Sequence, residues 1–150
     1  GESFHYDSSV YPAWNDRYGW KSVPGTPFIF EPSGLMEFPV PVTGYPVQFA
    51  FSGGAYLRIL PWRFIEYSLD RALNNNSLSM VYIHPWELSE NLPSVWKGNY
   101  RAALTRYPGL GKMRKRVKAL FEKYAENMAG MATCLDQHTI SLHYSLNNQD

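Results

Sequence analysis

A histidine at the end of an apolar run is the residue of this sequence best placed to do chemistry. Positions 81–90 read VYIHPWELSE, so His84 follows a β-branched stretch and precedes a proline that cannot continue a strand. An exposed imidazole can carry and donate a proton near neutral pH, which is the chemistry of a general acid. A histidine that is hydrogen-bonded within a core has the same position in sequence, so both interpretations stand at this point.

Two other stretches carry groups that could act on a ligand. Asp7 is followed by Ser8 and Ser9, which is typical either of a hydrogen-bonded turn or of a carboxylate held by hydroxyl groups. The run GKMRKRVK at 111–118 could contact phosphate or acidic glycans. Such basic runs are more often the solvated face of a helix. The apolar residues within and just after this run would form the opposite, buried face, which favours that interpretation.

Common catalytic and cofactor-binding patterns are absent from the sequence. No two of the four histidines, His5, His84, His138 and His143, have the spacing of a helical zinc pair. There is no Gly-x-Ser-x-Gly elbow, no phosphate loop and no dinucleotide fingerprint. We therefore expect no metal site built from this chain alone.

Composition limits the classes of fold and partner. The chain has 150 residues, 45% of them hydrophobic, which suits one domain with a sizeable core. Its 14 Lys and Arg residues nearly balance 13 Asp and Glu residues, so no nucleic-acid partner is expected. No run approaches the roughly eighteen apolar residues of a membrane span. The single cysteine, Cys134, excludes an internal disulfide and leaves the compartment open.

The elements that would position these groups begin with a region rich in proline, glycine and aromatic residues. Residues 11–34 carry too many large apolar groups to stay solvated, which predicts an ordered loop that covers apolar surface. The stretch 36–42 predicts an edge strand with prolines on one face and, on the other, Met36, Phe38, Val40 and Val42. A short strand is predicted within 45–51, and Gly53-Gly54 predicts a tight turn or a close backbone approach.

Residues 61–150 carry more regular patterns. A helix is predicted from Pro61 to about Asn74, with helical spacing of Trp62, Ile65, Leu69, Ala72 and Leu73. The stretch 78–84 predicts a buried strand, and a helix followed by a strand implies a parallel α/β arrangement. A last long helix should start near Lys112, with one apolar stripe made of Met113, Val117, Leu120, Phe121, Tyr124 and Met128. The tail offers a further short strand.

Four separated stretches resemble an enzyme family by their order along the chain. They are YDSSVYP, LMEFPV, FSGGAYLRILP and VYIHPWE. They resemble the C-terminal half of NodB-type polysaccharide deacetylases, the family-four carbohydrate esterases, in a bacterial branch with a C-terminal extension. The resemblance runs from about Phe4 to about Tyr124.

The resemblance implies a fold and a domain organisation. The fold would be α/β, a partial, distorted (β/α) barrel with Pro-rich loops and a C-terminal helix. Residues 1–150 would form a single unit, with the late barrel motifs in about 1–98 and a helical extension in about 99–150.

The resemblance also implies roles for individual residues. The family removes N-acetyl groups from amino-sugar polymers with a divalent metal, usually zinc. His84 matches the general acid that protonates the leaving amine, and Asp7 matches the aspartate that pairs with it. Such a carboxylate would stabilise the protonated imidazole. The residues expected to bind substrate are Tyr82, Tyr6, Trp86 and Arg58. At Tyr82 the sequence departs from the family, which has leucine in its Leu-x-His motif.

The family's early motifs are missing from this sequence. An Asp-Asp pair supplies the base and one metal ligand, and a His-x-x-x-His element supplies two more ligands; neither occurs here. Without them a metal cannot be held in the usual way to activate water. We expect a fragment of a longer enzyme, a truncated relative without catalysis, or a subunit completed by the missing N-terminal half or by another copy. The chain alone should be inactive with added zinc.

A function of a different class also fits the sequence. Aromatic residues make up 16% of the chain, and they can stack on sugar rings as well as fill cores. A non-catalytic glycan-binding or assembly module would use an aromatic surface made of Tyr6, Trp14, Trp20, Trp86 and Trp96. Both functions predict a polysaccharide partner. The polymer and the compartment, cytoplasmic or envelope-associated in a bacterium, are left open.

Overall fold

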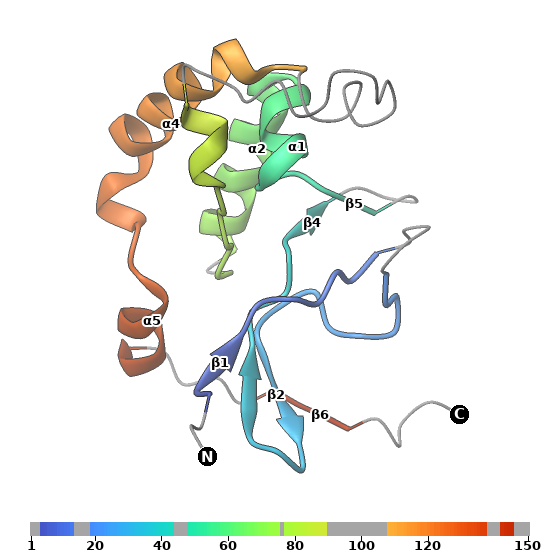
Figure 1. The fold of residues 1–150 in the computed structure, drawn as a ribbon. Helices are drawn as coiled ribbons and strands as arrows, with labels where there is room; N and C mark the ends of the chain where they lie inside the picture. Colours follow the sequence, from blue (N-terminus) through green and yellow to red (C-terminus); the bar gives the residue numbers. More distant parts are fainter. Residues whose placement is uncertain are drawn as a thin grey trace.

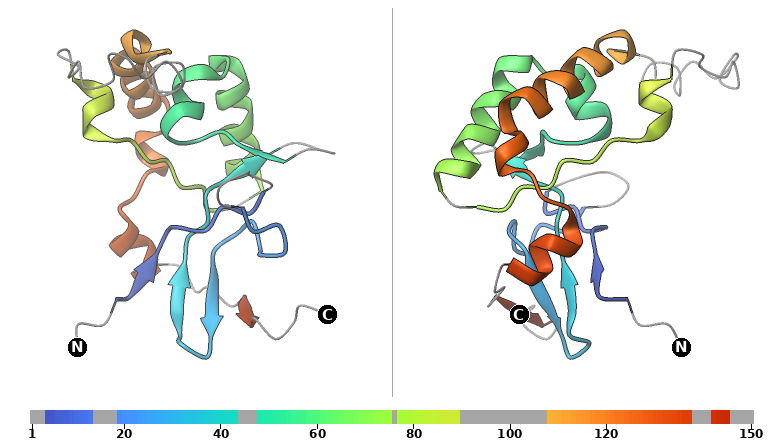
Figure 2. Two further views of the ribbon diagram at one scale, coloured as in Figure 1. Left: turned by 45° about the vertical axis from the view of Figure 1, so that its right-hand side comes forward. Right: turned by 90° about the vertical axis from the view of Figure 1, so that its left-hand side faces the viewer.

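The computed structural model describes residues 4–13, 19–43, 48–75, 77–89, 108–137 and 142–145. These residues form two regions, one made of strands and the other mainly of helices (Figure 1). We call the four-stranded sheet and the loops packed on it the sheet half. The helical half comprises the helices between residues 54 and 124, at the top of Figure 1, and the described segments that connect them. The two further views in Figure 2 show the same separation.

The sheet half joins segments from both ends of the chain. Its strands, in spatial order, are β1 (Tyr6–Asp7), β3 (Leu35–Glu37), β2 (Phe28–Glu31) and β6 (His143–Ser145). β2 and β3 form an antiparallel hairpin, whereas β1 pairs with β3 and β6 pairs with β2 in parallel. The hairpin turn includes Gly34, whose φ of 70° lies in the left-handed region that glycine adopts without strain. The carboxyl-terminal segment therefore completes a sheet begun near the amino terminus.

An aromatic cluster covers one face of this sheet. Phe28 is fully buried, and its ring lies 4.9 Å from Phe30 and 5.5 Å from Tyr144, measured between centroids. Trp20 stacks on Phe30 at 6.1 Å. The prediction that residues 11–34 are ordered and cover apolar surface is confirmed for the described part of that stretch. The prediction missed that this stretch also contains strand β2. Trp14 lies outside the described residues.

The predicted edge strand over 36–42 is wrong in its extent and in its edge position, because β3 ends at Glu37 and lies between β1 and β2. The chain leaves β3 after Glu37 and enters a second sheet, in which β4 (Val42–Thr43) pairs antiparallel with β5 (Phe49–Ala50). Pro39 and Pro41 are buried together with the apolar residues between which they lie. Although the prolines have no N–H to donate, the Phe38 and Val40 N–H groups donate to the carbonyl oxygens of Asp7 and Val10, both at 2.9 Å, so this stretch stays bonded to the segment of β1.

The helical half is built from helices in the middle and later part of the chain. Its elements are α1 (Gly54–Ile59), α2 (Trp62–Asn74), the short 3-10 helix η1 (Pro85–Leu88) and α4 (Leu110–Tyr124). Its buried core consists of Phe51, Leu57, Ile65, Leu69, Met113, Leu120 and Tyr124. After α4 follow η3 (Ala125–Asn127) and α5 (Met131–Gln137), and α5 lies beside the sheet half in Figures 1 and 2.

Both long predicted helices are confirmed. The helix expected from Pro61 corresponds to α2, where Pro61 is the N-cap residue, and the helix expected near Lys112 begins at Leu110. The apolar stripe predicted for α4 needs one correction. Met113, Leu120 and Tyr124 are buried, but Phe121 is 57% exposed because its position is rotated away from the face that contacts α1 and α2.

The described strands do not close into a barrel, and the fold is mixed α/β. The stretch 78–84, predicted as a buried strand, is extended and only half-buried. Among the described residues, its strand pairing consists of a single parallel bridge between Tyr82 and Gly53. No helix among the described residues has the length and apolar character needed to cross a membrane.

Candidate functional site

The turn that follows His84 is closed by two hydrogen bonds to a single residue. The His84 N–H donates to Glu87 Oε2 at 2.9 Å, and the Glu87 N–H donates to the His84 carbonyl oxygen at 2.9 Å. Pro85 occupies the first helical position of η1, where its fixed φ suits a helical turn and its missing N–H costs nothing. The backbone of His84 is therefore fixed on both its donor and its acceptor side.

The imidazole ring of His84 is exposed and has an aromatic ring on either side. The Trp86 ring is stacked with it at a centroid distance of 6.1 Å and an interplanar angle of 15°. The Tyr82 ring meets it edge-on at 5.6 Å and 75°. His84 is thus not a core histidine, and its ring is accessible to a ligand that contacts this surface.

Tyr82 lies directly on the backbone of Gly53 and Gly54. The Gly54 N–H donates to the Tyr82 carbonyl oxygen at 3.3 Å, and an added Cβ at Gly53 would lie 2.0 Å from the Tyr82 ring. A side chain at position 53 would therefore force the Tyr82 ring to move. The predicted close backbone approach at Gly53-Gly54 is confirmed, and the group that approaches is the residue expected to line the acetyl pocket.

Beneath the exposed ring lies a buried ion pair. Arg58 Nε of α1 is 2.8 Å from Glu87 Oε1, and the two side chains are 3% and 0% exposed. Arg58 also donates from Nη1 to the Pro108 carbonyl oxygen at 3.3 Å and lies over the Trp86 ring at 5.3 Å. The sequence placed Arg58 among the substrate-binding residues; the structure instead engages its guanidinium with protein groups below the surface.

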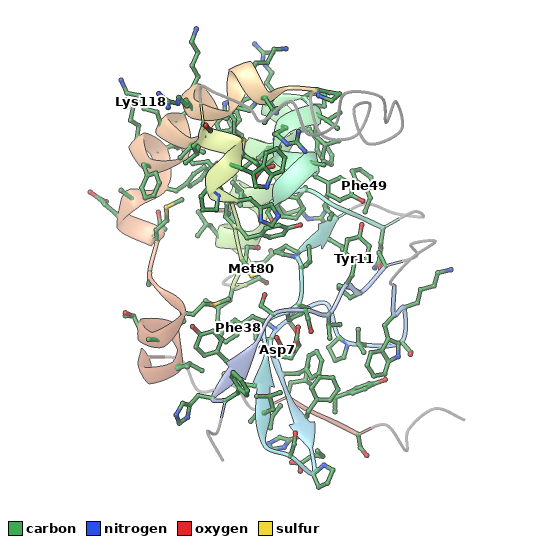
Figure 3. All side chains as sticks on the ribbon, in the orientation of Figure 1. Asp7, Tyr11, Phe38, Phe49, Met80 and Lys118 are labelled. Atoms are coloured by element: carbon green, nitrogen blue, oxygen red, sulfur yellow. The ribbon has the colours of Figure 1, made fainter. Side chains whose placement is uncertain are left out.

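The other predicted catalytic residue, Asp7, lies in the sheet half (Figure 3). Its carboxylate accepts hydrogen bonds from the Ser8 N–H at 2.8 Å and from the Ser9 hydroxyl at 2.7 Å. This is the local turn that the sequence offered as one of two interpretations. Tyr6, expected to bind substrate, lies next to it on β1, is 40% exposed and packs edge-on against Phe38.

Asp7 and His84 are not joined by a hydrogen bond in the described structure. Ser8, the residue after β1, contacts the segment that leads to His84. Its hydroxyl lies 2.6 Å from the Met80 sulfur. Met80 precedes His84 by four residues, which an extended chain spans in about 13 Å. A direct hydrogen bond between the two side chains is therefore not formed, and their pairing through one water stays a prediction.

A buried carboxyl next to Asp7 was missed in the sequence. Glu37 of β3 is opposite Asp7 in the register of the sheet and is fully buried. Its Oε1 accepts the Val10 N–H at 2.9 Å, while Oε2 is buried without a hydrogen-bond partner among the described atoms. Burial raises the pKa of this carboxyl, and the nearby charge of Asp7 adds to the effect. The only signal in sequence was a charge inside an apolar, proline-flanked stretch.

The basic run at 111–118 forms the start of α4 and divides into two groups. Arg114 donates to the Leu88 carbonyl oxygen at 2.8 Å and Arg116 donates to the Leu57 carbonyl oxygen, so both arginines tie α4 to neighbouring elements. The lysines are exposed, and Lys118 pairs with Glu122 at 3.5 Å along the helix. This arrangement agrees with the solvated-face interpretation.

Within the described parts of the chain, no three His, Cys, Asp or Glu side chains gather closely enough to hold a metal ion. The residues described here thus do not fit the zinc site that the resemblance implies for a complete enzyme, and we derive no step through a metal. Trp96, one of the residues of the alternative aromatic surface, lies outside the described residues, as Trp14 does.

The chain belongs to a family described as "Domain of unknown function (DUF3473)", which matches residues 8–131. The match includes the Gly53-Gly54 pair, Arg58 and the turn after His84. No curated protein and no solved structure matches the chain.

Proposed function

We propose that this chain is the C-terminal part of a metal-dependent polysaccharide N-deacetylase, which removes acetyl groups from N-acetylated amino-sugar polymers. Domains of its family are found at the C-terminus of polysaccharide deacetylase-like proteins, which supports this placement. In the complete enzyme, a distorted (β/α) barrel of the NodB type would include the strands described here. The observation that carries the proposal is the exposed imidazole of His84 on a backbone fixed by Glu87.

In this proposal His84 acts as the general acid. Hydrolysis of an N-acetyl group adds water oxygen to the carbonyl carbon and breaks the C–N bond, and the departing nitrogen must gain a proton to leave as an amine. An exposed imidazolium can donate that proton. Tyr82 and Trp86 flank the ring and would contact the sugar or the acetyl group.

The remaining groups of the proposed reaction come from elsewhere. The divalent metal, which we propose is zinc, would be held by residues outside the described set, supplied by an N-terminal half or by another chain. Asp7 and Tyr6 lie on β1 and would reach the substrate from the sheet half. In this structure the Asp7 carboxylate accepts hydrogen bonds from Ser8 and Ser9, and among the described residues no hydrogen bond joins it to His84.

The proposal is tested by acetate release from N-acetylglucosamine oligomers by the complete enzyme that contains this chain. The variant His84→Gln removes the proton donor, and we expect turnover to fall by about 10²–10⁴-fold, the usual contribution of general acid–base catalysis. His143→Gln is a matched control, because His143 is exposed and pairs with Glu31 in the sheet half. Turnover that is unaffected by His84→Gln would exclude the acid role.

A non-catalytic glycan-binding module is the alternative, favoured by the lack of a metal-binding group among the described residues. This function requires that the chain alone bind N-acetylated oligomers after treatment with a chelator, and that Trp86→Ala weaken the binding. Calorimetry or NMR titration of the chain measures both. Metal-independent binding with no acetate release from the complete protein would favour the module over the enzyme.

A further inference from the structure

We propose that Arg58 and Glu87 are positioning residues, which fix the orientation of the His84 ring from below. This inference rests on the proposed function for its catalytic meaning, but the positioning itself concerns only groups of this chain. Neither residue touches the exposed face of the imidazole. Arg58 acts through Glu87 and Trp86, and Glu87 acts through the backbone N–H of His84.

The first route runs through the backbone. The two carboxylate oxygens of Glu87 are divided between two partners: Oε1 is 2.8 Å from Arg58 Nε, and Oε2 accepts the His84 N–H at 2.9 Å. A carboxylate held by only one of these contacts could rotate. Because Arg58 holds one oxygen, the other is fixed where the His84 N–H meets it, and the φ and ψ angles of His84 follow.

The second route runs through the ring. Arg58 lies over Trp86 at 5.3 Å, and Trp86 is stacked with the imidazole of His84 at 15° between planes. The guanidinium, the indole and the imidazole thus form a series that begins in the interior and ends at the surface. The Arg58 bond to the Pro108 carbonyl oxygen fixes the guanidinium to the turn that leads into α4.

The burial of the pair argues that it specifies geometry rather than stability. With 3% and 0% of the two side chains exposed, both charges have lost their hydration, and this cost offsets much of their mutual attraction. Apolar replacement of both partners of such pairs is often tolerated, whereas removal of one partner leaves a buried charge. A double apolar variant can therefore separate the positioning role from a requirement for folding.

The test uses NMR spectra of this chain, with the ring protons of His84 as the readout. These protons carry ring-current shifts from Trp86 and Tyr82, and the variant Trp86→Leu measures how large the Trp86 contribution is. We expect the double variant Arg58→Met with Glu87→Leu to remain folded while the His84 ring signals move toward those of His5, an exposed histidine. His84 signals unchanged from wild type in the folded double variant would overturn the inference.

A second variant keeps the test decisive if the double variant does not fold. Arg58→Lys retains the positive charge beside Glu87 but loses the planar group that also reaches Trp86 and Pro108. We expect a partial movement of the His84 signals in Arg58→Lys. Arg116→Met is the matched control, since Arg116 is another arginine of the helical half and donates to the Leu57 carbonyl oxygen of α1. Equal movement in both variants, or none in Arg58→Lys, would contradict the positioning role.

The catalytic consequence is measured in the complete enzyme. Misplacement of a reacting group by about 1 Å can cost about 100-fold in rate, so we expect Arg58→Lys to lower kcat by about 10- to 100-fold and to leave KM nearly unchanged. Unchanged kcat with displaced His84 signals would contradict the catalytic part of the inference. If His84→Gln has no effect on acetate release, the proposed function fails, while the NMR measurement still decides whether Arg58 and Glu87 position the ring.

Discussion

The helical half and the sheet half are stabilised in different ways. In the helical half, Leu57, Ile65 and Met113 are fully buried and come from helices whose apolar residues recur at helical spacing. The strands of the sheet half are two to four residues long, and its cohesion comes from an aromatic cluster contributed by both ends of the chain. Each long helix of the helical half is therefore recognisable from its own sequence pattern, whereas the sheet half depends on the pairing of short strands such as β2 and β6 from distant parts of the chain.

This difference separates the two residues that the resemblance assigned to catalysis. His84 takes its support from α1 and η1 of the helical half, through Glu87. Asp7 takes its support from the turn after β1, through Ser8 and Ser9. The relative placement of a candidate acid and a candidate carboxylate thus depends on how firmly the two halves are joined.

The largest expected effects come from removing one core residue of each half. Phe28→Ala leaves a cavity in the aromatic cluster and should lower the free energy of unfolding by about 3–5 kcal/mol, and Leu57→Ala should lower it by about 2–5 kcal/mol. We expect both variants to shift one common transition in urea, because hydrogen bonds link the segments between the two halves. The Ser8 hydroxyl lies 2.6 Å from the Met80 sulfur, and the Val40 N–H donates to the Val10 carbonyl oxygen. Fluorescence and circular dichroism should report the same midpoint.

Phe121→Ala provides the control for this comparison. Its side chain is 57% exposed on α4, so its removal should change the free energy of unfolding by no more than about 0.5 kcal/mol. Two separate transitions, with Phe28→Ala moving only one of them, would show that the halves unfold independently.

The helical half was largely predictable from the sequence. The spacing of Ile65, Leu69 and Leu120 identifies the faces of α2 and α4 that are buried, because a helix is defined by residues three and four apart. Helix α1 was missed, since its residues follow a glycine pair that also fits a turn. The exposure of Phe121 was missed as well, because a stripe in sequence does not fix how wide the buried face is.

The sheet half was less predictable for a physical reason. Strand β6 pairs with β2 from the other end of the chain, and nothing in either short segment specifies its partner. The burial of Glu37 also needed the tertiary structure, since it depends on the placement of β3 between β1 and β2. At the candidate site, the sequence singled out His84 and the Gly53-Gly54 pair but left open whether the histidine is exposed and whether the glycines mark a turn or a close approach. The Arg58–Glu87 pair needed the tertiary structure.

The two halves should respond to pH in opposite directions, and Glu37 sets the response of the sheet half. Burial raises the pKa of Glu37 above its ordinary value of 4.5, so the folded state binds the proton more tightly than the unfolded state does. Its contribution to stability is complete below 4.5 and is lost as the pH rises through the folded-state pKa. Glu37→Gln should be more stable than wild type above this range, because the neutral amide does not carry the negative charge that burial disfavours.

Urea denaturation of Glu37→Gln and wild type at several pH values between 4 and about 8 measures this difference. Glu126→Gln is the control, because Glu126 is exposed on η3 and should leave the pH profile unchanged. A stability gain for Glu37→Gln that is the same at every pH would show that titration of the carboxyl is not its cause.

The helical half should lose stability in acid, with the smallest of these effects. The Tyr124 hydroxyl of α4 donates to Asp70 Oδ1 of α2 at 2.7 Å, and Lys123 Nζ lies 3.0 Å from Oδ2. The bond from Tyr124, and to a lesser extent the bond from Lys123, lowers the pKa of Asp70 below its ordinary value of 3.8. The stability that these bonds supply is therefore present above pH 3.8 and is lost as the pH falls through the lowered pKa. Burial raises the pKa of Tyr124 to about 12, and its hydroxyl therefore remains a donor at neutral pH.

Tyr124→Phe removes this donor and keeps the buried ring. We expect the free energy of unfolding to fall by about 1 kcal/mol at neutral pH, the usual contribution of one hydrogen bond, and the difference from wild type to shrink in acid as Asp70 becomes protonated. Tyr67→Phe on α2 is the matched control, because Tyr67 is 60% exposed. If Tyr124→Phe loses the same stability at low pH as at neutral pH, the bond to Asp70 is not what makes the helical half sensitive to acid.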